Sequence, residues 1–174
     1  MGEIYWERAF VGFGANLGDP AKMLRRAEAA LRALEEVRAL HRSPLYRTRP
    51  VGPVPQADFV NAVFSLETSS SAEALLDLLL RLETELGRRR GSSWGPRTID
   101  LDLLLYGELV LDTPRLRLPH PELARRGFVL VPLADLAPDL RPPNHRRTVA
   151  ELLDDWRCAT PRAALDVRHI GEWG

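Results

Sequence analysis

Two aspartates, Asp100 and Asp102, stand two positions apart in an apolar stretch that reads WGPRTIDLDLLLYG. Because apolar residues alternate with them, the stretch predicts a strand with both carboxylates on one face, about 6.5 Å apart. Two bare carboxylates at that distance repel by roughly 2–3 kcal/mol at an effective dielectric constant of ~20. The pair therefore needs positive charge nearby. A hard cation such as Mg²⁺ would supply it; solvent exposure or pairing with an arginine such as Arg97 is the alternative.

A basic loop, GRRRGSSWGPR (residues 87–97), leads directly into this strand. Its arginines are Arg88, Arg89, Arg90 and Arg97, and guanidinium groups beside a metal site suit a polyphosphate. A solvated basic loop is the alternative. Because the glycines and serines give the backbone freedom, we also predict a lid that orders over bound substrates. Trp94 is the large apolar side chain that such a lid would bring to the site.

A second polar group lies in the segment FVNAVFSL, where Phe59 and Asn61 share one face of a predicted strand. An aromatic ring beside an amide can stack on a flat heterocycle and hydrogen-bond its edge, and Phe128 could supply a second ring. Phe59 could equally be a core residue. A lone histidine such as His120 is more often structural, although beside phosphates it could donate a hydrogen bond.

Regular elements must place these groups together. Strands are predicted at residues 8–13, 37–47 (interrupted at Pro44), 59–66 and around 99–105. One helix is predicted to begin at Asp19–Pro20, and another after Ser70 and Glu73, which have capping-box spacing, ending at Gly87. The order β-α-β-β-α-β predicts an α+β, ferredoxin-like sandwich with both helices on one sheet face. C-terminal additions follow, including a short helix within 121–138 and another helix at 148–156.

The composition fits one domain over residues 1–174 with zero formal net charge, which gives no global attraction to nucleic acid or a membrane. A single cysteine, Cys158, argues against a disulfide or a zinc site. The N-terminus lacks a basic region followed by an apolar run, so a cytoplasmic protein is expected. GFGANLG has the spacing GxGxxxG, so we interpret it as a tight turn rather than a dinucleotide site.

Together these segments resemble the 6-hydroxymethyl-7,8-dihydropterin pyrophosphokinase family of folate biosynthesis. The resemblance covers about residues 8–140. Its parts are GFGANLGD, LYRTRPVGP, DFVNAVFSLET, the arginine loop, WGPRTIDLDLLLYG (the most specific) and LRLPHPELARRGFVLVPLADLAP. It implies a ferredoxin-like fold and transfer of pyrophosphate from ATP to the hydroxymethyl oxygen of the pterin, with release of AMP.

The resemblance also implies roles for single residues. Asp100 and Asp102 would hold two Mg²⁺ ions that bridge the ATP phosphates, and with Arg88 and Arg97 they would form the catalytic set. Positions that match the nucleotide side are Glu83, Arg88, Trp94, Arg97, Leu103, Arg115, His120 and Arg126. Positions that match the pterin pocket are Thr48, Val51, Phe59, Asn61, Trp94, Asp100 and Phe128. ATP and the pterin are the implied partners, without nucleic acid or membrane, and a monomer is expected.

Some features lie outside the family pattern. Arg49 stands where proline is common, and Phe59 where tyrosine is common, and no role is implied for residues after about 156. Two other functions remain open. A transferase that binds a metal–nucleotide through Asp-x-Asp normally needs a larger domain. A ferredoxin-like RNA-binding module needs exposed aromatic residues on its central strands, whereas the aspartates here repel phosphate unless a metal intervenes.

Overall fold

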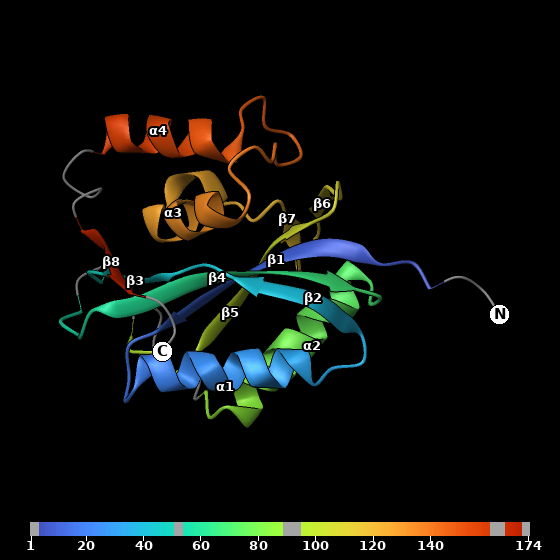
Figure 1. The fold of residues 1–174 in the computed structure, drawn as a ribbon, viewed down its shortest axis with the longest axis horizontal. Coiled ribbons are helices and arrows are strands. Elements are labelled where there is room, and N and C mark those ends of the chain that lie inside the picture. The colour runs from blue at the N-terminus through green and yellow to red at the C-terminus, as the bar shows by residue number, and fades with distance from the viewer. Residues whose placement is uncertain (1–3, 51–53, 89–94, 161–165, 172–174) are drawn as a thin grey trace.

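The computed structural model describes residues 4–50, 54–88, 95–160 and 166–171. Its centre is a six-stranded antiparallel sheet in the order β5-β1-β4-β3-β8, in which β2 also pairs with β4 (Figure 1). The strands of this sheet are β1 (Glu7–Ala15), β2 (Val37–Arg42), β3 (Leu45–Thr48), β4 (Phe59–Thr68), β5 (Asp100–Tyr106) and β8 (Val167–Gly171). A separate hairpin consists of β6 (Leu111–Asp112) and β7 (Arg117–Leu118).

Helices α1 (Pro20–Arg32) and α2 (Ala72–Glu85) cover the lower face of the sheet in Figure 1. The side chain of Asp19 caps α1 and Pro20 is at its start, as predicted. The cap of α2 is Ser71, whose hydroxyl accepts a hydrogen bond from the backbone N–H of Ala74, so the predicted cap at Ser70 is wrong by one residue. The backbone N–H of Ser70 instead donates to the hydroxyl of Thr68 at the end of β4.

The opposite face carries the C-terminal helices. After a short 3-10 turn (η1, Leu123–Arg125), helix α3 (Gly127–Leu136) packs on β4 and β3, and α4 (Val149–Ala159) packs on α3. A full capping box between Thr148 and Glu151 begins α4, in agreement with the helix predicted at 148–156. These helices fill part of the sheet face that the two earlier helices leave open.

The predicted order of strands and helices up to residue 106 is confirmed, with two local differences, and one strand of the central sheet beyond that residue was not predicted. Gly14 and Ala15 continue the ladder of β1, pairing with Asn61 and Val60, so GFGA is strand rather than turn. The strand predicted at 37–47 is two strands. Strand β8, which pairs with β3, was not predicted, because its residues are largely exposed and lack an apolar alternation.

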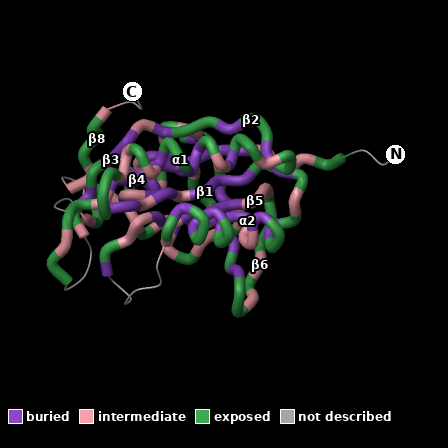
Figure 2. The backbone as a smooth tube through the Cα atoms, turned by 90° about the horizontal axis from the view of Figure 1, so that it is seen from below, coloured by how far each residue is buried: buried purple, intermediate pink, exposed green. Residues whose placement is uncertain are grey.

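Burial follows this layering. The backbone through β4, β1 and β5 is mainly buried in Figure 2, whereas β8 at the sheet edge is mainly exposed. One apolar cluster lies between the sheet and α1 and α2, and a second lies between the sheet and α3 and α4. Among the described residues, no helix has the length and apolar character needed to cross a bilayer.

Candidate active site

A cavity of about 880 Å³ opens on the upper face of the sheet, between the sheet and the segments around α3. Its floor is set by strand pairing. Gly14 of β1 lies directly opposite both Asp100 of β5 and Asn61 of β4, and Gly12 lies opposite Asp102. Directly paired residues share a face, so two aspartates and an amide surround a strip of bare backbone. Glycine keeps this strip open: a Cβ on Gly14 would lie 3.2 Å from Asn61 Oδ1.

Asp100 lies between two guanidinium groups. Arg97 pairs with its Oδ2, and Arg88 pairs with its Oδ1 at 2.9 Å. The alternative raised from the sequence, in which arginines neutralise the aspartates, therefore holds for Asp100 in this structure. The same contacts place two guanidinium groups of the basic loop beside the strand that carries the aspartates. Residues 89–94 of that loop, including Arg89, Arg90 and Trp94, lie outside the described residues, and so does the lid predicted there.

Asp102 is in a different environment from Asp100. Its carboxylate forms no ion pair with any side chain in the described part of the chain. Burial, and then the negative charge of Asp100, raise the pKa of the Asp102 carboxyl, although His120, Arg126 and Arg97 lower it. Burial lowers the pKa of His120, whereas the negative charge of Asp102 raises it. The site thus holds a carboxylate whose charge is poorly compensated, which favours a bound cation.

Glu83 of α2 supports this arrangement from below. Only 2% of the residue is exposed, its Oε1 accepts a hydrogen bond from Leu101 N at 2.6 Å, and it pairs with Arg88. Burial raises the pKa of Glu83, while the bonds from Leu101 and Arg88 lower it. Glu83 therefore links the position of Arg88 to the backbone of the strand that carries both aspartates.

The other end of the cavity is lined by aromatic and neutral polar side chains. Asn61 is 5% exposed and donates from Nδ2 to Thr48 Oγ1 at 2.7 Å, which leaves its Oδ1 toward the floor beside Gly14. Phe59 and Phe128 both line the cavity and are only partly buried. The core-residue alternative for Phe59 is therefore wrong, since its ring reaches an open surface.

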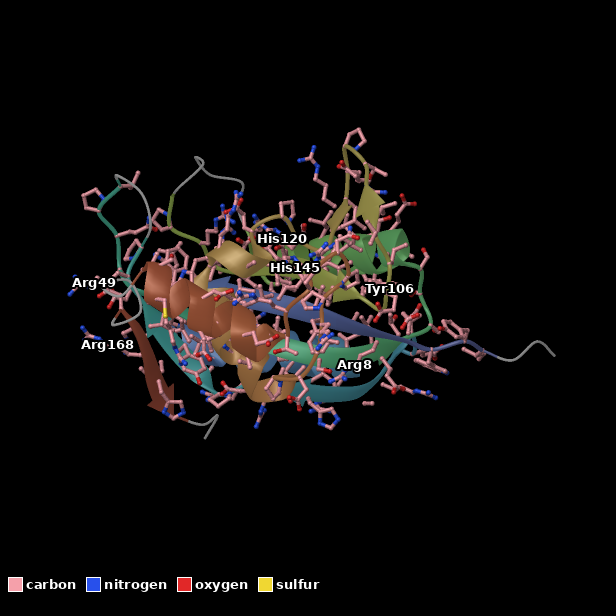
Figure 3. All side chains as sticks on the ribbon, turned by 90° about the horizontal axis from the view of Figure 1, so that it is seen from above. Arg8, Arg49, Tyr106, His120, His145 and Arg168 are labelled. Atoms are coloured by element: carbon pink, nitrogen blue, oxygen red, sulfur yellow. The ribbon has the colours of Figure 1, made fainter. Side chains whose placement is uncertain are left out.

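The C-terminal segment completes one wall. Trp156 of α4 packs so closely on Gly127 that a Cβ there would lie 2.1 Å from the indole ring. Beyond α4, Asp166 pairs with Arg49 at 3.3 Å, and both line the cavity beside β8. In Figure 3, Arg49 lies at the end of the sheet where β8 runs, remote from His120. This wall could not be predicted from the sequence, because its residues match no motif. Asp166 and Arg49 come together through the pairing of β8 with β3, and Trp156 reaches Gly127 through the packing of α4 on α3.

The structure brings most of the predicted site residues to one cavity. The predicted residues that line it are Thr48, Phe59, Asn61, Arg97, Asp100, Asp102, Arg126 and Phe128. Arg88, Glu83 and His120 are not among the lining residues, although Arg88 contacts both Asp100 and Glu83. Leu103 packs in the core under the sheet, and Arg115 pairs with Asp77 on the surface. Val51 lies outside the described residues. Gly12, Gly14 and Trp156 were missed, although two glycines spaced by two on a strand are a readable sign of close backbone approach.

Comparisons with known proteins agree with this geometry. The model of the family "7,8-dihydro-6-hydroxymethylpterin-pyrophosphokinase (HPPK)" matches residues 10–138. A Pseudomonas aeruginosa 2-amino-4-hydroxy-6-hydroxymethyldihydropteridine pyrophosphokinase is 49% identical over 147 residues, which is 84% of this chain and 90% of that protein. A Synechocystis protein of the same name is 42% identical over 150 residues, or 86% of this chain and 76% of that protein.

The chain belongs to the HPPK family.

Solved structures extend the comparison to the fold. A Plasmodium falciparum HPPK-DHPS chain superimposes with a TM-score of 0.77 at 13% identity, covering 96% of this chain and 49% of that one. The present chain thus spans about half the length of that larger protein. The segment matched by the HPPK family model contains both aspartates and the aromatic residues, whereas Trp156, Asp166 and β8 lie beyond it. The C-terminal wall therefore takes Trp156 and Asp166 from outside the matched segment, where they contact Gly127 and Arg49 within it.

Proposed function

We propose that this chain transfers the pyrophosphoryl group of ATP to the hydroxymethyl oxygen of 6-hydroxymethyl-7,8-dihydropterin, giving AMP and the pterin diphosphate in folate biosynthesis. One observation carries the proposal: a single cavity has two adjacent aspartates at one end and Thr48, Asn61 and two phenylalanines at the other. A charged end suits a polyphosphate and the opposite end suits a flat heterocycle, in a chain that belongs to the HPPK family.

The donor set fits magnesium. No cluster of three or more His, Cys, Asp or Glu side chains suited to a metal occurs among the residues that the structure describes. A site with only Asp100 and Asp102 leaves most coordination positions to water and phosphate oxygens, as Mg²⁺ prefers. We propose that these two carboxylates hold two Mg²⁺ ions, which neutralise phosphate charge when bound. Arg88 and Arg97 would then exchange their contacts with Asp100 for phosphate oxygens.

The remaining predicted residues divide between the two substrates. On the nucleotide side we propose Glu83, Leu103, Arg115, His120 and Arg126, with Trp94 covering the site. On the pterin side, Phe59 and Phe128 would stack on the two ring faces, Asn61 and Thr48 would hydrogen-bond the ring edge, and Val51 would contact it. The hydroxymethyl oxygen would bond to the β-phosphorus as the bond from that phosphorus to the α–β bridging oxygen breaks. AMP leaves, and the hydroxyl proton passes to solvent.

We further propose that residues 1–174 form one domain of the ferredoxin-like class. The antiparallel order β5-β1-β4-β3, with α1 and α2 on one face, supports that class. The protein would act as a monomer in the cytoplasm. Neither a nucleic acid nor a membrane would be a partner, in keeping with a net charge of zero.

AMP release from Mg–ATP tests the function. With 6-hydroxymethyl-7,8-dihydropterin present, AMP and a pterin diphosphate should appear in equal amounts. The analogue with a 6-methyl group, which lacks the acceptor oxygen, should release no AMP. Thermal-shift titration against a sugar nucleotide or RNA examines the other two functions, because a ligand stabilises the folded state that binds it. AMP release that is independent of the pterin would overturn the proposal.

A further inference from the structure

Asn16 is a buried polar residue at a junction of three strands. It follows the last residue of β1 and is 6% exposed. Three segments meet there: the end of β1, the residues that precede β4, and the residues that precede β5. A buried amide must find partners for its donors and acceptors, because an unpaired polar group in the interior costs about 1–3 kcal/mol.

The partners of Asn16 come from the other two segments. Its Oδ1 accepts a hydrogen bond from Arg97 N at 2.8 Å, and its own backbone N–H donates to Arg97 O at 3.0 Å. Its Nδ2 donates to Gln56 Oε1 and to Ala57 O, both at 2.9 Å. The orientation of the amide is fixed by chemistry, since a backbone N–H can only donate and a carbonyl oxygen can only accept.

These partners belong to opposite ends of the cavity. Gln56 and Ala57 lead into Phe59, at the proposed pterin end. Arg97 pairs with Asp100, at the proposed phosphate end. Gln56 and Arg97 both line the cavity, whereas Asn16 lies behind it. One side chain therefore fixes the separation between the segment before the stacking ring and the segment that carries a phosphate-binding arginine.

We infer that Asn16 is a positioning residue that sets the alignment of the two substrates without touching either. The inference rests on the proposed function, because it assigns one end of the cavity to each substrate. Loss of the Asn16 side chain should leave each half of the site able to bind its own ligand. Transfer between the ligands should suffer, because it depends on the distance between the reacting atoms, and a misplacement of about 1 Å can cost ~100-fold in rate.

The test compares Asn16→Ala with Ser43→Ala. Ser43 is also buried, at 1% exposed, and its hydroxyl also joins two backbone groups, accepting from Val63 N at 3.0 Å and donating to Pro44 O at 2.8 Å. It does not line the cavity, so it reports what loss of a buried hydroxyl does to stability alone. We expect both variants to unfold at lower temperature, and only Asn16→Ala to lower kcat, by roughly 10- to 100-fold.

Calorimetry separates alignment from binding. For Asn16→Ala, the Kd values of the pterin alone and of Mg²⁺ with a non-hydrolysable ATP analogue alone should stay within about threefold of wild type, which is below ~0.7 kcal/mol. If the ATP analogue strengthens pterin binding in the wild type, that strengthening should be smaller in Asn16→Ala. Asn16→Asp keeps the acceptor for Arg97 N but cannot donate to Ala57 O, so its kcat should lie between those of wild type and Asn16→Ala. If the alanine variant does not fold, Asn16→Asp takes its place as the test variant.

The outcomes are distinct. If wild-type protein shows no pterin-dependent AMP release, the proposed function fails. If wild type is active and both Asn16 variants keep the wild-type kcat per folded molecule, the inference about Asn16 fails. It also fails if Ser43→Ala loses as much kcat as Asn16→Ala, since the effect would then follow from lost stability.

Discussion

The two faces of the central sheet differ in content although the same strands form both. On the lower face, Leu101, Leu103 and Val11 pack under α1 and α2 and are at most 3% exposed. On the upper face, the residues next to them in sequence are Asp100, Asp102 and glycines. Burying a leucine contributes roughly 1.5–3 kcal/mol. The lower face thus contributes stability that offsets the like charges and bare backbone at the cavity end of the upper face.

The largest expected effect is a loss of turnover, and it should follow from substitutions of the aspartates on the upper face. Asp100→Ala or Asp102→Ala is expected to lower kcat by at least about 1,000-fold, or ~4 kcal/mol, because phosphate charge would lose its metal ligands. AMP release under saturating substrates measures this effect, and circular dichroism should show an intact fold. A variant that kept more than about a tenth of wild-type turnover would show that its carboxylate is not a required ligand.

The intervening residue should behave in the opposite way. Leu101→Ala removes a core side chain and is expected to lower the free energy of unfolding by about 2–5 kcal/mol, as measured in urea. The kcat per folded molecule should stay within a few-fold of wild type. A Leu101→Ala variant with normal stability and low turnover would show that the lower face also contributes to turnover. The two faces would then not differ in function.

Within the upper face, the cavity ends should be separable. Phe128→Ala should weaken pterin binding by at least 0.5–1.5 kcal/mol, the value of a stacking contact beyond its buried area. Binding of the ATP analogue should change much less. Calorimetry of each ligand decides the matter, and equal losses for both would mean that the aromatic end does not belong to the pterin.

Removing one charge from the upper face should stabilise the metal-free protein. Burial and Asp100 raise the pKa of Asp102, so the folded state retains this proton to a higher pH than the unfolded chain does. Stability therefore falls as pH rises from the ordinary aspartate pKa through the raised one. At neutral pH without Mg²⁺, Asp102→Asn should raise Tm by a few °C, the size expected for about 1 kcal/mol in a domain of this length. An unchanged or lower Tm would show that the charge of Asp102 does not destabilise the metal-free protein.

The smallest expected effect comes from substituting the two glycines at the floor of the cavity. Gly14→Ala places a Cβ 3.2 Å from Asn61 Oδ1, closer than an ordinary contact, whereas Gly12→Ala meets Leu104 at 3.5 Å. We expect Gly14→Ala to weaken pterin binding by about 1 kcal/mol or less and Gly12→Ala to leave it nearly unchanged. Equal effects of the two substitutions would show that the amide of Asn61 is not the sensitive contact.

The sequence predicted the two faces well where periodicity decides them. Alternation placed Asp100 and Asp102 on one face of their strand, and Phe59 and Asn61 on one face of another. The turn residues indicated the element order, but the common sheet face of Asp100 and Asn61 follows only from their pairing with Gly14. It did not predict what depends on distant pairing. The contacts of Asn16 with Gln56 and Arg97 join three loops, and no local pattern encodes their meeting. The pairing of β8 with β3 was missed for the same reason. The cap at Ser71 was misplaced because three consecutive serines (69–71) precede the helix and Ser70 has capping-box spacing to Glu73.

The contact between Gly127 and Trp156 has a consequence for related sequences. The indole ring occupies the space that any side chain at position 127 would need, at the point where the chain passes from Arg126 to Phe128. A larger residue at position 127 therefore requires a smaller one at position 156, and a relative without the tryptophan is free to replace the glycine. The two positions should covary, so the residue at position 156 of α4 should change together with the residue that precedes Phe128.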